Sequence, residues 1–293
     1  MKEYFILFNP KAGNGWNEQL KQSVGAKIPD GNLIFKDITK IDYKKFFSEI
    51  SKEQKIVLVG GDGTLNRFLN DTEKFSFDND IFYIAKGSGN DFLNDIKHNE
   101  DENKPILINK YFENLPKVTV NGKTYRFLNG IGYGIDGYCC EEGDRLKQKS
   151  DKAVNYTAIA IKGLLYAYSP RNAKITIDGV TKEFKKVWLS PTMNGRFFGG
   201  GMMPTPDQDR LNPDRTVSLF VWHSTGKIKT LMNFPKIFTG EHIKLKTNCE
   251  VFKGKNIFVE FDRPCALQID GETVLNVKNY KVESALSKEK VNV

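Results

Sequence analysis

The stretch KIVLVGGDGTLN, residues 55–66, combines a short apolar run, a glycine-rich turn and the start of a helix. Its apolar part, Ile56–Val59, has the unbroken hydrophobicity of a parallel strand that is buried on both faces. The turn Gly60-Gly61-Asp62-Gly63-Thr64 follows, and a helix is expected to run through Arg67–Asn70. This order of strand, turn and helix predicts one unit of an α/β domain with a parallel sheet.

Similar units lie on both sides of this stretch. Apolar runs at Tyr4–Phe8, Leu33–Ile38 and Ile81–Ala85 predict strands, whereas Trp16–Lys27 and Tyr43–Ser51 predict helices. Residues 1–117 are therefore expected to form a three-layer α/β domain with a parallel sheet. In such sheets, ligands bind beyond the carboxyl ends of the strands.

The pattern changes after residue 117. Asn121-Gly122 and Asp178-Gly179 are each flanked by strand-like runs, and these dipeptides are strong hairpin signals. Further strands are expected at Val217–Trp222, Ile257–Phe261 and Ala266–Ile269, and helices at 139–149 and 154–168. Residues 118–280 are thus expected to form an antiparallel β domain with helical insertions.

Composition favours a soluble cytoplasmic protein. The 293 residues are 39% hydrophobic and 27% charged, as is ordinary for a folded soluble chain. The apolar runs are far shorter than the ~20 residues that cross a bilayer, and the N-terminal run predicts a strand rather than a signal peptide. The cysteines lack metal-ligand spacing, which suits a reducing compartment. The net charge of +8 suits an anionic partner.

Three glycine-bearing loops follow strands of the first domain, at residues 9–13, 60–64 and 86–91. Glycine lets backbone N–H groups approach phosphate oxygens, and the next helix offers its positive end. One such loop is usually only a turn, but three at one sheet edge favour a phosphate site. Asp62 could serve a metal or a proton transfer, or cap a helix. Lys11 could neutralise phosphate or be a solvated loop residue.

These loops resemble the diacylglycerol kinase catalytic domain family, which includes bacterial soluble lipid kinases and sphingosine kinases. The resemblance rests on FNPKAG at 8–13, GGDGTLN at 60–66 and GSGNDF at 87–92. It continues, in the family's order, with NGIGYGID at 129–136, GGGM at 199–202 and IDGE at 269–272. It implies a nucleotide-binding domain, a β-sandwich-like second domain and an active cleft between them. It also implies that residues 281–293 return to the first domain.

The resemblance further implies the site residues. The expected ATP-binding set is Asn9, Pro10, Lys11, Ala12, Gly13, Thr39, Gly60, Gly61, Asp62, Gly63, Thr64, Leu65, Asn66, Arg67 and Ser88. A magnesium ion would be held by the Asp214 carboxylate and by the carbonyl groups of Leu211 and Thr216, although the residues alone indicate only an acidic surface loop. The catalytic candidates are Glu272, Asp270 and Asp62.

Glu272 falls at the family's proton acceptor. On the residues alone, Asp270-Gly271 reads as a hairpin turn with Glu272 as a solvated flank. The resemblance instead makes Glu272 the base that takes the proton of a lipid hydroxyl, and the choice between Glu272 and Asp62 stays open.

The chain departs from the family's pattern at two positions. Arg67 stands where the family usually has Glu, which adds positive charge near the expected phosphates. Arg215 stands where the family usually has Gly, after the expected metal-binding Asp214. These changes could alter or abolish activity.

The segment from Lys227 to Lys246 is basic and apolar, with five lysines against one acidic residue. Such a segment can lie on an anionic membrane surface. The alternative is an ordinary helix whose apolar side faces the core. Pro235 restricts any helix in this segment to two pieces.

Together these observations predict an ATP- and Mg²⁺-dependent kinase that phosphorylates a lipid hydroxyl, in a diacylglycerol or a sphingoid-base-like lipid. It would be cytoplasmic and peripherally associated with anionic membrane, would not bind nucleic acid, and could form a homodimer. An NAD kinase-like enzyme is one alternative, because NAD kinases share the Gly-Gly-Asp-Gly-Thr loop. An inactive nucleotide- or lipid-binding regulator is the other.

Overall fold

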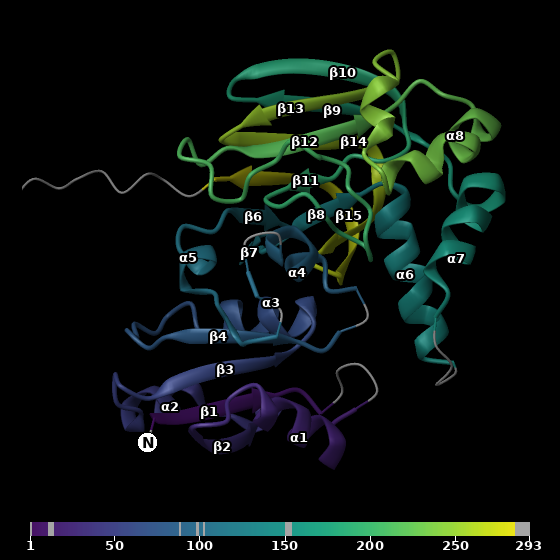
Figure 1. Ribbon diagram of the computed structural model, residues 1–293. Coiled ribbons are helices and arrows are strands. Elements are labelled where there is room, and N and C mark those ends of the chain that lie inside the picture. The colour runs from purple at the N-terminus through teal and green to yellow at the C-terminus, as the bar shows by residue number, and fades with distance from the viewer. Residues whose placement is uncertain are drawn as a thin grey trace, which may run out of the picture. The chain divides into compact units, whose positions relative to one another are not determined.

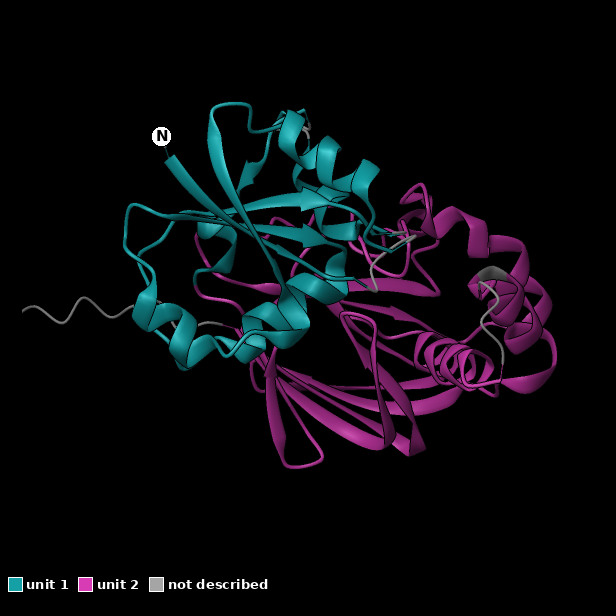
Figure 2. Cartoon of the chain, turned by 90° about the horizontal axis from the view of Figure 1, so that it is seen from below, with its two compact units in different colours: residues 1–113 teal, residues 114–293 magenta. Residues whose placement is uncertain are grey.

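The protein is described by a computed structural model that covers residues 2–10, 15–87, 89–97, 100–101, 103–149 and 154–284 (Figure 1). The chain divides into two compact units, Met1–Glu113 and Asn114–Val293, which Figure 2 colours separately. The first unit is an α/β domain with a mostly parallel sheet, and the second has an antiparallel sheet. The predicted fold class is confirmed.

Unit 1 contains a five-stranded sheet in the order β2-β1-β3-β4-β5. The first four strands run parallel, and β5 is antiparallel to β4. The strands are β1 (Lys2–Phe8), β2 (Gly31–Asp37), β3 (Lys55–Gly60), β4 (Ile81–Ala85) and β5 (Ile106–Leu107). The helices are α1 (Glu18–Ala26), α2 (Tyr43–Glu49), α3 (Asp62–Asp71), α4 (Asp91–Ile96) and α5 (Asn109–Phe112), with the 3₁₀ turn η1 (Ile38–Lys40).

Alternation along the strands places helices on both faces of this sheet. Ile6 and Val57 point to one face, where they pack with Val24 of α1. On the other face, Phe5 meets Phe46 of α2 with ring centroids 5.2 Å apart. Helices α3 and α4 lie on this second face too, since the rings of Phe68 and Phe92 contact Tyr43 of α2 and Tyr83 of β4. The result is a three-layer α/β/α unit.

Unit 2 is built on antiparallel strands in the order β13-β12-β11-β8-β14-β15-β6-β7, with β9 paired to β14 and β10 to β9. The strands are β6 (Lys117–Val120), β7 (Lys123–Arg126), β8 (Gly130–Tyr133), β9 (Arg171–Ile177), β10 (Val180–Val187), β11 (Thr192–Met193), β12 (Val217–Trp222), β13 (Cys249–Gly254), β14 (Asn256–Ile269) and β15 (Glu272–Glu283). The helical elements are α6 (Ile135–Lys147), α7 (Tyr156–Lys162), the π-helical turn η3 (Gly163–Ala167), α8 (Lys227–Asn233), and the 3₁₀ turns η4 (Phe234–Ile237) and η5 (Glu241–Lys244).

Strand β14 changes its pairing partner along its length. The first part of β14 pairs with β9, its last part pairs with β8, and the register shifts around Cys265 between them. Ile175 of β9 and Leu219 of β12 consequently belong to one buried cluster. The opposite side of β12 is also buried, because Trp222 packs with residues of α6, α7 and η3.

The two predicted hairpins form as type I′ turns. Asn121 and Gly122 have φ of 48° and 75°, and they join β6 to β7. Asp178 and Gly179 have φ of 45° and 87°, and they join β9 to β10. Positive φ at both central residues is what this turn requires.

The ends of the chain's elements differ in places from the predicted bounds. Lys117 begins β6 of unit 2, although residue 117 was expected to close the first domain. Residues 281–283 were expected to belong to a segment that returns to the first domain, but they pair with β6 inside unit 2 because β15 continues to Glu283. Residues 285–293 lie outside the described residues. Among the helices of the described chain, none has the length and apolar character needed to cross a bilayer.

Candidate active site

The parallel strands of unit 1 bring four segments to one edge of its sheet. Phe8, at the end of β1, lies between Asp37 of β2 and Val59 of β3, and Gly60 pairs with Ala85 of β4. The chain that follows each strand therefore leaves from the same carboxyl edge. These segments contain Asn9 and Pro10, Thr39, the run from Gly61 to Arg67, and the glycine loop before α4. Lys11, Ala12, Gly13 and Ser88 lie outside the described residues.

Two of these glycine loops touch through their backbones. A Cβ atom on Gly61 would lie 2.9 Å from the Cα of Gly87, and a Cβ on Gly87 would lie 2.6 Å from the Cα of Gly61. Real Cβ atoms do not approach other atoms so closely, so both positions require glycine. Gly60 is restricted in a similar way by the Thr64 side chain, whose Oγ1 would be 2.4 Å from an added Cβ.

Asp62 joins these loops by hydrogen bonds. Its Oδ2 accepts from the backbone N–H of Asp91, and its Oδ1 accepts from the backbone N–H of Phe92, each at 2.9 Å. These two amides begin α4, so the carboxylate satisfies N–H groups that have no partner within the helix. A negative charge is also favourable at a helix N-terminus. Asp62 was considered as a cap for its own helix, but it caps the neighbouring one.

The other predicted nucleotide-binding residues that are described lie at this edge with definite partners. Asn9 donates from Nδ2 to Oγ1 of Thr64 at 3.1 Å, which links the ends of β1 and α3. Thr39 donates from its N–H and hydroxyl to Oδ1 of Asp37, and these hydrogen bonds lower the pKa of the Asp37 carboxyl. Thr64, Leu65 and Asn66 are buried on α3.

Arg67 lies on an exposed side of α3. Its Nε is 3.4 Å from Oδ2 of Asp71, one helical turn further on. An exposed ion pair at this spacing contributes little to stability, about 0.3–0.5 kcal/mol. Its guanidinium is therefore not locked in place by this pairing, and its expected role toward nucleotide stays a prediction.

In unit 2, Asp270 is an anchor of the fold. Asp270 and Gly271, with φ of 46° and 95°, form the hairpin turn between β14 and β15. The Asp270 carboxylate accepts backbone hydrogen bonds from Leu128, Asn129 and Gly130, at 2.5, 2.8 and 2.9 Å. It thereby fixes the start of β8, about 140 residues earlier in the chain.

Glu272 has the opposite environment. It is the first residue of β15 and pairs with Ile269 across the turn. Its side chain is exposed and has no hydrogen-bond or ion-pair partner among the described residues. Of these two carboxylates, Glu272 is the one with the freedom to accept a proton from a bound molecule.

The loop that was expected to bind magnesium is closed by amide side chains. Asn212 donates from Nδ2 to the carbonyl oxygens of Asp209 and Thr216, at 2.7 and 2.9 Å. Its Oδ1 accepts from the backbone N–H of Thr216 at 2.9 Å. Gln208 donates from Nε2 to the same Thr216 carbonyl at 3.0 Å. The Asn212 amide nitrogen thus lies between two carbonyl oxygens, as a bound cation would.

This arrangement does not fit the expected metal site. A carbonyl oxygen has two lone pairs, and both of those on Thr216 are used by Asn212 and Gln208. Asp214 is exposed. Arg215 adopts φ of 57°, in the left-handed region that favours glycine. The roles of Leu211 and Asp214 stay predictions.

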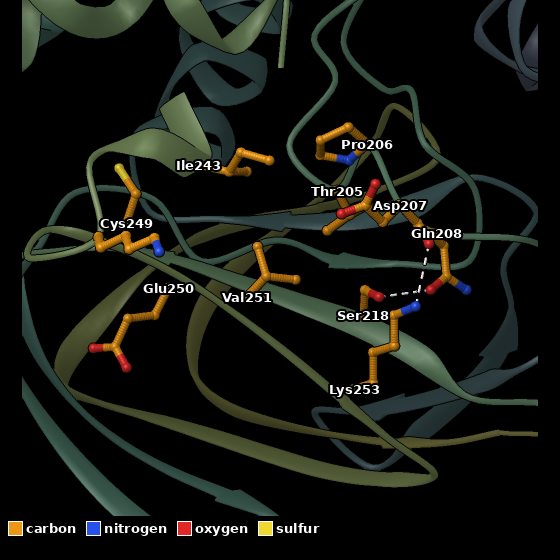
Figure 3. A pocket seen from close by; sticks show the side chains of 11 residues that line it. Thr205, Pro206, Asp207, Gln208, Ser218, Ile243, Cys249, Glu250, Val251 and Lys253 are labelled. Carbon is orange, nitrogen blue, oxygen red and sulfur yellow. Dashed lines mark hydrogen bonds between the residues drawn. The ribbon is translucent and has the colours of Figure 1, made fainter. Parts of the chain in front are cut away.

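Sequence reasoning missed Asn212 and Gln208. Gln208 is buried, and Ser218 donates its hydroxyl to Oε1 of Gln208 at 2.6 Å. Figure 3 shows Gln208 and Ser218 together in the lining of a pocket of about 500 Å³. In the sequence Gln208 stands among charged and polar residues that indicate a solvated loop, so no local signal marked it as buried.

We predict that Asp62→Asn destabilises unit 1. The substituted amide can keep one of the two hydrogen bonds, but its NH₂ group would face the other backbone N–H. The loss of a helix cap costs about 0.5–2 kcal/mol. Thermal melts should show this loss, and hydrogen exchange should accelerate at Asp91 and Phe92. An unchanged melt with unchanged exchange would contradict the assigned capping role.

We also predict that the Asn212 loop does not depend on a metal. In the absence of nucleotide, neither EDTA nor millimolar Mg²⁺ should shift the melting temperature of the wild type. Asn212→Asp should lower it, because a carboxylate oxygen would then face two carbonyl oxygens, and Mg²⁺ or Ca²⁺ should partly restore it. Asn276→Asp, at an exposed position of β15, controls for the added charge. If Mg²⁺ instead raised the melting temperature of the wild type and not that of Asn212→Asp, the prediction that the loop is independent of metal would be wrong.

Comparison with known proteins assigns both units. The family model described as the diacylglycerol kinase catalytic domain matches residues 3–115. The model described as the YegS C-terminal NAD kinase beta sandwich-like domain matches residues 129–283.

Two relatives and one solved structure illustrate this similarity. The chain is 21% identical to the "Putative lipid kinase YtlR" of Bacillus subtilis, with 98% of each chain covered. It is 24% identical to a diacylglycerol kinase of Mycobacterium tuberculosis, over 72% of this chain and 71% of that one. It shares its fold with a crystal structure titled as a putative diacylglycerol kinase from Bacillus anthracis, with a TM-score of 0.68, 21% identity, and coverage of 96% of this chain and 91% of that one. The chain therefore belongs to the lipid kinase family that joins a diacylglycerol kinase catalytic domain to a YegS C-terminal NAD kinase beta sandwich-like domain.

Proposed function

We propose that this protein transfers the γ-phosphoryl group of ATP, in the presence of Mg²⁺, to the hydroxyl of a lipid such as a diacylglycerol or a sphingoid base. The observation that carries the proposal is the carboxyl edge of unit 1, where Asp62 holds two glycine loops together. This edge belongs to a chain of the lipid kinase family. Phosphoryl transfer depends mainly on positioning and on charge stabilisation, and a rigid edge of backbone N–H groups serves both.

Gly63 supports a ligand at this edge. It is exposed in the first turn of α3, and a Cβ atom on it would meet nothing within 4 Å. Its packing does not require glycine, unlike that of Gly60, Gly61 and Gly87. A glycine that packing does not require suits the close approach of a phosphate group to the helix N-terminus. The roles proposed for Lys11, Ala12, Gly13 and Ser88 rest on the resemblance alone.

We assign the role of general base to Glu272. A lipid alcohol is a weak nucleophile at neutral pH, so a carboxylate within hydrogen-bond reach must take its proton. Glu272 is exposed and without a partner among the described residues. Asp270 is engaged by three backbone N–H groups and Asp62 by two.

Magnesium would enter with the nucleotide, as the counter-ion of the ATP phosphates. The loop around Asn212 takes no part in this proposed reaction. All four cysteines are free thiols, which supports a cytoplasmic location. Because the proposed substrate is a lipid, we also propose that the enzyme contacts the membrane peripherally; a homodimer stays a prediction.

We predict that Gly63→Ala separates stability from nucleotide binding. Replacing glycine by alanine in a helix stabilises a protein by about 0.5–1 kcal/mol, so the melting temperature should rise. ATP affinity should fall, because the methyl group occupies the space proposed for a phosphate. Gly25→Ala in α1 is the matched control: its Cβ would make an ordinary contact, 3.9 Å from Leu33. It should raise the melting temperature alone. Unchanged ATP affinity in Gly63→Ala would remove the ligand from this position.

We predict that Glu272→Gln slows phosphoryl transfer by roughly 10²–10⁴, the usual contribution of a general base. The melting temperature and ATP affinity should stay unchanged, because Glu272 holds no other described residue.

Asp270→Asn provides the contrast for this test. Its amide would leave a backbone N–H of Leu128, Asn129 or Gly130 unmet, at a cost of about 1–3 kcal/mol, so its main effect should be a lower melting temperature. Normal turnover of Glu272→Gln would refute its role as the base.

A further inference from the structure

Helix α8 presents apolar side chains to solvent. Ile228 and Met232 lie one helical turn apart and are 72% and 75% exposed. The opposite side of the helix faces the interior, where Thr230 is buried and Leu231 packs against the core of unit 2. The lysine-rich segment is therefore not an ordinary amphipathic helix with all its apolar side chains turned inward.

Elements that pack against α8 carry further exposed apolar side chains. The π-helical turn η3 packs against α8, and Lys227 donates from Nζ to the carbonyl oxygen of Leu165 at 3.1 Å. Figure 1 shows α7 and α8 at the same end of unit 2. Tyr166 of η3 is 80% exposed, and Phe238 after η4 is 43% exposed. We call Tyr166, Ile228, Met232 and Phe238 the α8 surface.

The α8 surface is held in place from beneath. Phe238 contacts Phe234, with ring centroids 6.2 Å apart, and Phe234 stacks on the buried Trp222 at 6.4 Å. The elements that carry these apolar side chains thus pack on the core through other residues. The exposed side chains themselves are not needed for that packing. Several exposed apolar side chains on neighbouring elements are typical of an interaction site.

The lysines beside this surface keep their charge unpaired. Lys227 donates to a carbonyl oxygen, Lys229 to Oδ1 of Asn248, and Lys236 to Oδ1 of Asn233, at 3.1, 3.1 and 2.8 Å. Within the described residues, none of the three forms an ion pair with a carboxylate. The single acidic residue of the segment, Glu241, pairs with Lys244 at 3.2 Å. The local field is therefore positive.

We propose that the α8 surface docks on an anionic phospholipid membrane, with its four apolar side chains at the boundary of headgroups and acyl chains and the lysines among anionic headgroups. The proposal rests on the proposed function for its purpose, since a lipid kinase must reach a substrate that resides in a membrane. A second copy of the chain is a poorer occupant, because a two-fold interface would bring the same patch, with its unpaired lysines, against itself.

The experiment is co-sedimentation with vesicles of phosphatidylcholine alone or of phosphatidylcholine and phosphatidylglycerol in equal amounts. The wild type should bind the anionic vesicles, and added salt should weaken binding because it screens the lysines. The double variant Ile228→Asp/Met232→Asp should bind at least about tenfold more weakly, since two apolar side chains that would enter the membrane become charged. The matched control is Val180→Asp/Leu275→Asp, at exposed apolar positions outside the α8 surface, which are 66% and 52% exposed. It should bind as the wild type does.

Equal vesicle binding by the two double variants would overturn the proposal, as would binding that ignores anionic lipid. The proposal would also be overturned if the wild type bound no vesicles but formed a dimer, and if Ile228→Asp/Met232→Asp dissociated that dimer. Lipid kinase assays separate this proposal from the proposed function. The variant should phosphorylate lipid in detergent micelles normally and fail on vesicles. Vesicle binding without phosphoryl transfer in either form would leave the docking surface standing and refute the proposed function.

Discussion

The carboxylate of Asp62 is the constraint on which the candidate site depends. Two glycine loops meet so closely at the edge of the unit 1 sheet that only glycine fits at Gly61 and Gly87. Backbones in such contact leave N–H groups that need acceptors, and Asp62 supplies two oxygens to the first amides of α4. These hydrogen bonds fix the positions of the two loops. They thereby also set the directions of the other backbone N–H groups of the loops, which would bind phosphate. Without it, the two loops would be separate turns.

The same device recurs in unit 2 with a different result. Asp270 fixes the start of β8 by accepting three backbone N–H groups, just as Asp62 fixes the start of α4. Each carboxylate is engaged in holding the backbone, which leaves Glu272 as the accessible carboxylate beside the β14–β15 turn. Asn212 also holds backbone groups together. Its amide nitrogen lies between two carbonyl oxygens, where a magnesium ion was expected. Several polar side chains of these motifs therefore hold the backbone in place. The proposed proton transfer is assigned to Glu272, which has no such structural role.

Local patterns predicted the fold well. Continuous apolar runs such as Ile56–Val59 became buried parallel strands, and Asn121-Gly122 and Asp178-Gly179 became hairpins, because these signals act over a few residues. The partners of Asp62 and Asp270 could not be predicted, since they lie about 30 and 140 residues away and are set by tertiary packing. Helical spacing also could not tell whether Ile228 and Met232 face the core or solvent, because both cases produce the same pattern.

The measurement that tests the central claim most directly is transfer from γ-labelled ATP to a panel of acceptors. Purified protein would be incubated with Mg²⁺ and with diacylglycerol in micelles, a sphingoid base in micelles, NAD or no acceptor. We expect label in a lipid product, with none in NAD and no more than background release without acceptor. Label in NAD would place the protein with the NAD kinases, and the absence of label from every acceptor, in a correctly folded and ATP-binding protein, would contradict the assignment of catalysis to this chain.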